Sequence, residues 1–121
     1  MSSVPRILSI FIDSSTGPAR NNILTKAGYA VTPAASTTRA FELLNEAEFA
    51  LVIIGQSVPT AERRLLFLEI NRKWGAPVLL VDSGEADPMI RARAHVSESA
   101  TPEELLATIA AIVPPKKSRS S

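Results

Sequence analysis

The fold is decided by the stretch Phe49-Ala50-Leu51-Val52-Ile53-Ile54-Gly55-Gln56-Ser57-Val58-Pro59. It is an apolar run, rich in β-branched residues, that stops at a glycine and is followed shortly by a proline. So short and apolar a run is typical of a strand buried on both faces, in the middle of a parallel sheet. In open α/β folds, ligands bind beyond the carboxyl ends of the central strands. Gly55 therefore stands where a reactive side chain would be expected, and it has none.

Strand-like runs and helical patterns alternate along the rest of the chain. The residue patterns predict further strands at 7–12, 29–32, 78–81 and 94–96, and helices at 18–27, 36–45, 60–74, 89–94 and 102–113. Right-handed crossovers between parallel strands place helices on both faces of the sheet. The chain is therefore predicted to be an α/β protein with one parallel five-stranded sheet.

Several helix ends carry capping signals. Pro18 suits a first helical turn, Gly28 a C-terminal cap, and Ser36 an N-cap. Thr101 and Glu104 have the spacing of a capping box. Apolar residues at helical spacing predict the buried stripes Ala19, Ile23, Leu24, Ala27; Ala40, Leu43, Leu44, Ala47; Leu66, Phe67, Ile70, Trp74; and Leu105, Leu106, Ile109, Val113. The helix at 89–94 is expected to be short, because a loop occupies the residues before it.

Length and composition predict one domain. The chain has 121 residues, of which 45% are hydrophobic, enough for one core at 6–113. Residues 1–5 are a short N-terminal segment, and 114–121 are predicted to be a disordered basic tail. No basic stripe interleaved with aromatic residues is present, so specific binding to nucleic acid is not expected. The lack of cysteine excludes disulfides and thiol chemistry. No signal peptide or membrane span is evident, which favours a cytoplasmic protein.

Over residues 6–113 the chain resembles a response-regulator receiver domain of the CheY-like kind. The most family-like stretch is Leu24-Thr25-Lys26-Ala27-Gly28-Tyr29-Ala30-Val31, and the helix beginning Pro102-Glu103-Glu104-Leu105-Leu106 is also similar. The resemblance implies a flavodoxin-like (βα)5 three-layer sandwich with sheet order 2-1-3-4-5. It also normally implies phosphorylation of an aspartate at the end of the third strand. Such a transfer needs a carboxylate nucleophile, an acidic pair that holds magnesium, a lysine and a switch hydroxyl.

Matching these positions one by one shows a degenerate phosphorylation site. The nucleophile position falls on Gly55, and the acidic pair is reduced to Asp13 followed by Ser14. The resemblance places the switch hydroxyl, the aromatic switch and the lysine on Asp82, His95 and Glu98. The chain thus resembles a pseudo-receiver without a phosphoacceptor aspartate. No catalytic residue is predicted, and the protein is not expected to be an enzyme.

The segment between Asp82 and Glu98 is shorter than in ordinary receivers by more than a helical turn, which predicts a shortened fourth helix. Receivers usually dimerise or bind targets through this helix, the fifth strand and the fifth helix. The resemblance implies a signalling module of the two-component (phosphorelay) superfamily that acts by phosphorylation-independent protein–protein interaction. An unidentified protein partner is expected, with a homodimer through the fourth and fifth strand and helix region as one form of it.

An alternative is a phosphate-binding loop at Ser14, Ser15, Thr16 and Gly17, which resembles the loop that holds the flavin mononucleotide phosphate in flavodoxins. Pro18 removes an amide from this loop, and Ala19 replaces the last threonine of that family's pattern. A serine-rich helix cap explains the same residues more simply. No cofactor is therefore predicted, and flavin binding stays the alternative.

Three carboxylates, Asp13, Asp82 and Glu98, are expected to converge on one edge of the sheet if the receiver alignment holds. They are interpreted as solvated loop residues rather than as a metal site. Unless an arginine or a cation neutralises them, their repulsion should raise the pKa of at least one. Glu98→Lys is then expected to stabilise the fold by about 0.5–1.5 kcal/mol. His95 has no serine or cysteine partner and is interpreted as a surface or edge-strand residue.

Overall fold

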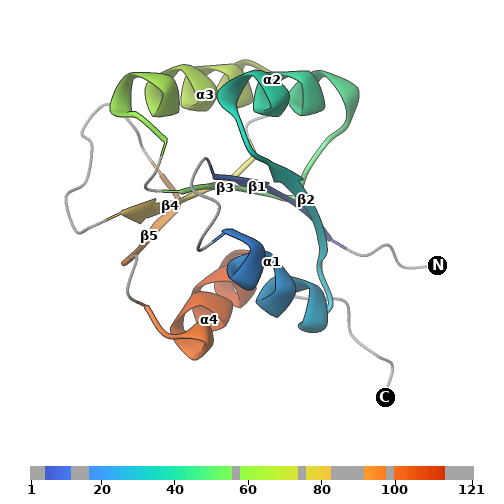
Figure 1. Cartoon of the computed structure of the whole chain (residues 1–121), viewed down its shortest axis with the longest axis vertical. Helices are drawn as coiled ribbons and strands as arrows, with labels where there is room; N and C mark the ends of the chain where they lie inside the picture. The colour runs from blue at the N-terminus through green and yellow to red at the C-terminus, as the bar shows by residue number, and fades with distance from the viewer. Residues whose placement is uncertain are drawn as a thin grey trace.

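A parallel sheet lies between two layers of helices (Figure 1). The computed structural model describes residues 5–11, 17–55, 58–73, 76–82, 92–97 and 100–113. Within them the elements are β1 (Arg6–Ile10), α1 (Gly17–Lys26), β2 (Ala30–Ala34), α2 (Thr37–Glu46), β3 (Leu51–Ile54), α3 (Thr60–Lys73), β4 (Val78–Asp82), β5 (Ala94–Ser97) and α4 (Pro102–Ile112). No helix in this part of the chain has the length and apolar character of a membrane span.

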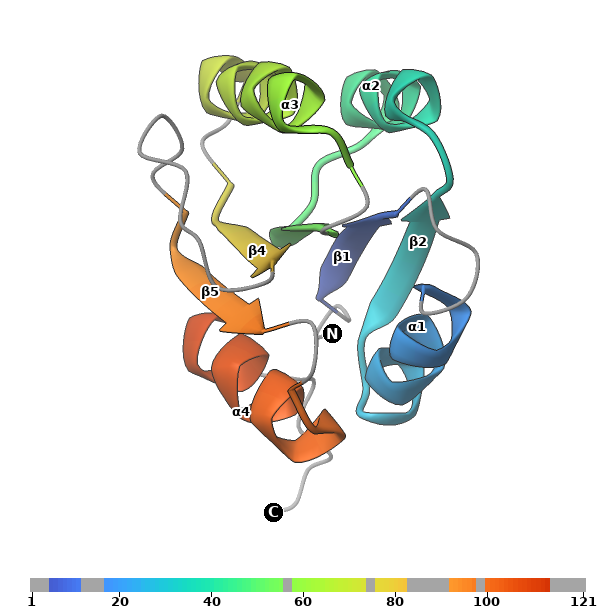
Figure 2. The same ribbon diagram turned by 60° about the vertical axis from the view of Figure 1, so that its left-hand side comes forward.

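The strand order is β2-β1-β3-β4-β5 and every pairing is parallel, which confirms the predicted fold class. β2 and β5 are the two outer strands of the sheet (Figure 2). β3 lies in the middle, where Ile7 pairs with Leu51 on one side and Val52 pairs with Val78 on the other. All four residues of β3 are buried. This confirms that the apolar run is a strand covered on both faces.

The two helical layers enclose two hydrophobic clusters. α2 and α3 cover one face of the sheet, and α1 and α4 cover the other (Figures 1 and 2). Because successive side chains of a strand point to opposite faces, Val52 and Ile54 belong to the first cluster while Leu51 and Ile53 belong to the second. The central strand therefore contributes to both halves of the core.

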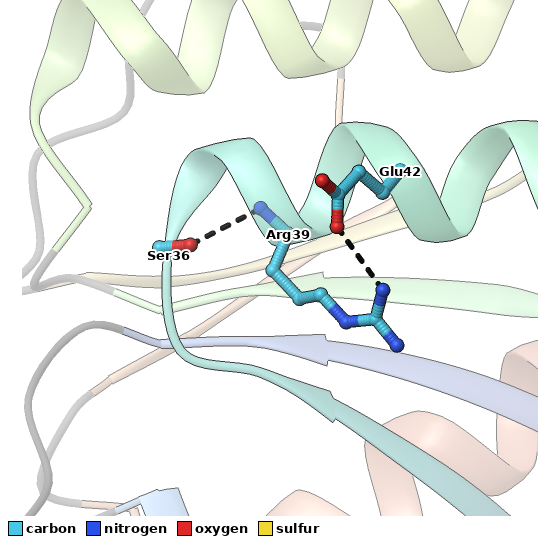
Figure 3. A network of polar contacts seen from close by, with 3 residues as sticks. All are labelled: Ser36, Arg39 and Glu42. Atoms are coloured by element: carbon cyan, nitrogen blue, oxygen red, sulfur yellow. Dashed lines mark hydrogen bonds and ion pairs between the residues drawn. The ribbon is translucent and has the colours of Figure 1, made fainter.

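The predicted caps are present. Ser36 Oγ accepts a hydrogen bond from the Arg39 amide at 3.1 Å (Figure 3). Thr101 and Glu104 form the reciprocal pair of a capping box. Gly28 closes α1 with a φ of 106°, a left-handed conformation that glycine adopts without strain. These ends are determined by local chemistry, so the sequence alone identified them.

One predicted stripe is wrong by one residue. Ala19 is exposed, whereas Arg20, four residues before the buried Leu24, is half-buried. Residues four apart share a helix face, and the aliphatic stem of arginine packs on apolar surface while its head group stays polar. The face that α1 turns toward the sheet therefore begins with a charged residue instead of an alanine.

The connection between β4 and β5 differs in part from the prediction. The expected helix at 89–94 falls largely outside the described residues, as do residues 1–4, Trp74 and the tail at 114–121. Its last part is wrong, because Ala92 and Arg93 are not helical and Ala94 begins β5. The Arg93 amide donates to the carbonyl of Val78 at 2.8 Å. This bond draws the chain into the sheet before the predicted end of the helix.

Candidate functional site

Gly55 lies at the carboxyl end of β3, as expected, and the chain around it leaves little room for a side chain. Its amide donates to the Ile10 carbonyl at 2.8 Å, and its own carbonyl accepts from the Val58 amide at 3.2 Å. A Cβ atom at this position would lie 3.1 Å from the Ile10 oxygen, closer than ordinary van der Waals contact. The Ile10 oxygen already accepts the Gly55 amide, so it cannot move away without weakening that bond.

The arginine of α1 reaches the same place. Arg20 Nη1 is buried and lies 3.6 Å from the position that a Cβ atom of residue 55 would take. A guanidinium remains charged at all ordinary pH values and offers five donors in a planar fork. The structure therefore places a permanent positive charge at the end of the central strand. β3 itself has no carboxylate at this place.

Arg20 also borders a small cavity beneath the ends of β4 and β5. The cavity has a volume of about 40 Å³ and is lined by Arg20, Val81, Val96, Ser97, Ala100 and Leu105. This space suits one or a few water molecules and is far below the 300 Å³ or more of a typical small-molecule pocket. It does not offer a place for a nucleotide.

A larger hollow lies on the opposite side of the molecule, near the amino ends of the strands. It has a volume of about 400 Å³, is open to solvent, and is lined by Leu44, Asn45, Glu46, Ala47, Glu48 and Lys73. These residues follow or end helices, and they lie near the amino end of β3. Ligands of parallel α/β folds bind at the carboxyl ends instead, so the hollow is not the candidate site.

The other predicted site residues divide into two groups. Asp82 ends β4 in register with Ser97, and His95 lies exposed in the edge strand β5, which confirms its interpretation as an edge-strand residue. The other group lies outside the described residues: Asp13, Ser14, Ser15, Thr16 and Glu98. The convergence of the three carboxylates therefore stays a prediction.

The alternative phosphate loop likewise stays a prediction, since Gly17, the first residue of α1, is its only member within the described residues. In the same part of the chain, no group of three or more His, Cys, Asp or Glu side chains is placed to hold a metal ion. The structure thus brings together Gly55 and Arg20, a pair that no sequence pattern links. The signal that could have found Arg20 is its spacing of four from Leu24.

The sequence matches no protein-family model, and no curated protein gives a match. Solved structures do. A CheY-like receiver domain from Methanospirillum hungatei is 22% identical, with a TM-score of 0.77, and the alignment covers 88% of this chain and 91% of that one. The fold is that of receiver domains. CheY4 of Vibrio cholerae gives 20% identity, a TM-score of 0.80 and coverages of 92% and 100%.

A third solved structure is the response regulator TrrA of Thermotoga maritima in complex with Mg²⁺ and BeF. Its identity is 20% and its TM-score 0.80, with 90% of this chain and 99% of that chain covered. Each of these domains matches nearly the whole length of this chain. The likeness therefore concerns the complete architecture and not a single βαβ unit.

Proposed function

We propose that this protein is a receiver-like module of two-component signalling that acts in the cytoplasm through protein–protein contacts and is not switched by phosphorylation. The observation that carries the proposal is the end of β3, where Gly55 stands in place of a nucleophile. Aspartyl phosphorylation requires a carboxylate oxygen to attack phosphorus. Glycine has no side chain and offers no such oxygen.

The charge at this edge of the sheet also argues for an unphosphorylated module. Arg20 brings a guanidinium to within 3.6 Å of the Cβ position of residue 55. In a receiver, a bound metal ion and a lysine neutralise the phosphoryl oxygens once the aspartate is phosphorylated. Here Arg20 places a guanidinium at the end of β3, where Gly55 offers no carboxylate to phosphorylate. We infer that the conformation of this edge is determined by the protein's own residues, so that partner binding needs no phosphoryl signal.

The test is to offer phosphoryl donors directly. We expect acetyl phosphate with Mg²⁺ to leave the intact mass of the protein unchanged. We also expect Mg²⁺ with beryllofluoride to leave the melting temperature unchanged, because a ligand that does not bind the folded state cannot stabilise it. An acid-labile phosphate adduct, or a clear rise in melting temperature with beryllofluoride, would refute the proposal. A conventional receiver treated in parallel serves as the positive control.

Gly55→Asp provides a second test. It restores a carboxylate, but Arg20 lies close enough to pair with it, and the receiver alignment places Glu98 where a lysine is needed. We expect this variant to remain unphosphorylated by acetyl phosphate. Phosphorylation of Gly55→Asp would show that the rest of the site is still competent for transfer.

We also propose that the inherited receiver surface around β4, β5 and α4 allows self-association. β5 is an edge strand, and an uncovered edge offers backbone groups to a second strand. Light scattering at rising protein concentration should show a dimer, with cross-links within residues 83–113. A monomer at every concentration would rule this surface out as a dimer interface.

A further inference from the structure

The outward side of α3 carries exposed apolar side chains. Leu65 is 55% exposed and Leu68 is 62% exposed, and they are the exposed large hydrophobic residues of the described chain. They are three residues apart, so they lie next to each other on the helix surface. The neighbouring Leu66 and Ile70 are fully buried against the sheet. α3 is therefore apolar on two sides, although only one of them faces the core.

Within the described residues, β5 and α4, which belong to the surface by which receivers usually associate, expose no large hydrophobic side chain. In α4 the exposed residues are small, polar or charged: Pro102, Glu103, Glu104, Ala107 and Ala111. In β5 the exposed residues are His95 and Ser97. A surface that docks a helix through its side chains needs a desolvated apolar centre, and aliphatic or aromatic side chains provide it. Among the described residues, α3 meets this requirement better than β5 and α4 do.

The charges around the two leucines have one sign. At helical spacing the outward face of α3 consists of Ala61, Arg64, Leu65, Leu68, Asn71 and Arg72, all of them exposed. The two carboxylates of the helix, Glu62 and Glu69, lie on its flank and are less exposed. The Thr37 hydroxyl of α2 donates a hydrogen bond to the Glu62 carboxylate, so this flank of α3 faces α2. The outward face therefore holds two leucines, two arginines and no carboxylate.

The ion pairs of α2 and α3 differ in how exposed their two partners are. On α2, Arg39 and Glu42 are similarly exposed, at 51% and 56%, so the charges offset each other at the surface (Figure 3). On α3, Arg72 contacts Glu69 at 3.2 Å but is 76% exposed, against 19% for the glutamate. The positive end of the pair points to solvent while the negative end lies close to the protein. Surface pairs of this kind are weak, so Arg72 can turn to another carboxylate.

We propose that the outward face of α3 docks an acidic amphipathic helix of a partner protein. The two leucines, one turn apart, match the aliphatic anchors of such a helix. Arg64 and Arg72 suit carboxylates beside those anchors, because guanidinium binds carboxylate in a planar, two-point geometry. A second copy of α3 fits less well, since two such faces would bring four arginines together while the carboxylates Glu62 and Glu69 lie on the flanks. This inference rests on the proposed function, in which partner binding is the signalling event.

The probe is a synthetic, fluorescently labelled helical peptide of about 16 residues, long enough to form a helix on a surface. It has leucines along one face and glutamates beside them; a control peptide has lysine in place of each glutamate. Fluorescence anisotropy at low salt should show at least tenfold tighter binding of the glutamate peptide, weakening as salt rises. Backbone amide NMR shifts in the full chain should then map the contact to residues 60–73.

Matched variants identify the surface. Leu65→Ser combined with Leu68→Ser changes only exposed side chains, so the fold should persist while affinity falls at least tenfold. Arg64→Glu combined with Arg72→Glu should reverse the preference between the two peptides. Ala107→Ser combined with Ala111→Ser, on the exposed side of α4, should change neither. Amide shifts that map to β5 and α4, or equal binding by the leucine variant, would overturn the proposal.

Sedimentation of the parent and of the leucine variant tests whether a second copy of this chain, and not a partner helix, covers the outward face of α3. Self-association that disappears with Leu65→Ser and Leu68→Ser would show that a second copy covers this face, and it would overturn the partner assignment. Phosphorylation by acetyl phosphate is measured separately. The proposed function can therefore fail while the α3 surface stands, and the reverse also holds.

Discussion

The strands of the parallel sheet all begin on one side of the molecule, the amino edge, and all end on the other, the carboxyl edge. These two edges differ in the contacts that their residues make. At the amino edge, Tyr29 precedes β2 and is only 3% exposed, and its hydroxyl donates to the carbonyl of Val113 at 2.6 Å, which joins the turn after α1 to the end of α4. At the carboxyl edge, Arg20 Nη1 lies 3.6 Å from the position that a Cβ atom of residue 55 would take, at the end of β3. The amino edge belongs to the stretch most similar to receivers, whereas at the carboxyl edge β3 ends in a glycine, which has no carboxylate.

This difference shows that the fold and the chemistry depend on separate residues. Burial of β3, β4 and their covering helices stabilises the sheet, and it does so whichever side chains end the strands. In open α/β folds, functional groups lie beyond those ends, outside the core. A chain can therefore keep the architecture and acquire a different function at the same edge.

The largest effect is expected at the amino edge. Tyr29→Ala should lower the free energy of unfolding by about 3–5 kcal/mol, because it leaves a cavity in the cluster under α1 and α4 and removes the bond to Val113. The melting temperature should fall by about 10–20 °C. Tyr29→Phe keeps the ring and should lose only about 1 kcal/mol. Urea unfolding of the three proteins measures both values, and similar losses for the two variants would show that the ring packs loosely.

At the carboxyl edge the expected effects are smaller. Gly55→Asn should destabilise the fold by about 1–2 kcal/mol, because its Cβ crowds the Ile10 carbonyl. Gly55→Asp has the same size, but its carboxylate can pair with Arg20. We expect the aspartate variant to be about 0.5–1 kcal/mol more stable than the asparagine variant.

Arg20→Gln is the control for this pairing. Urea unfolding of Gly55→Asp and Gly55→Asn should be repeated in the Arg20→Gln background, which completes a double-mutant cycle. Without the guanidinium, aspartate should lose its advantage. An advantage that survives in this background would mean that another group neutralises the introduced carboxylate.

The parts of the fold that local chemistry determines were predictable. β3 followed from its apolar run, and the ends of α1, α2 and α4 followed from Gly28, Ser36 and Thr101. The position of Arg20 was not predictable in this way, because it depends on how a long side chain crosses from α1 to the end of β3. In α3 the run from Leu65 to Leu68 is apolar throughout. Only the packing of the helix shows that its first and last members face solvent.

A pH dependence should distinguish the amino edge from the rest of the protein. Burial raises the pKa of the Tyr29 phenol above its ordinary value of 10.0. The folded state then holds the proton more tightly than the unfolded state. The resulting stability is fully present below pH 10 and is lost as pH rises through the folded pKa. Compared with Tyr29→Phe, the parent should therefore lose its advantage in alkaline solution. A constant difference between the two proteins from pH 8 to pH 11 would contradict this.

The smallest effect is expected for Glu98→Lys. Receiver alignment places Asp13, Asp82 and Glu98 together, and without a neighbouring cation this substitution would gain about 0.5–1.5 kcal/mol. Arg20 already supplies a cation at the end of β3, so we now expect a gain below about 0.5 kcal/mol in low salt at pH 7. The same substitution in the Arg20→Gln background should recover the larger gain, because the carboxylates then lack their guanidinium. Thermal melts of the four proteins measure this. A large gain in the parent background would show that Arg20 does not neutralise these carboxylates, and that the two edges are less different than the structure indicates.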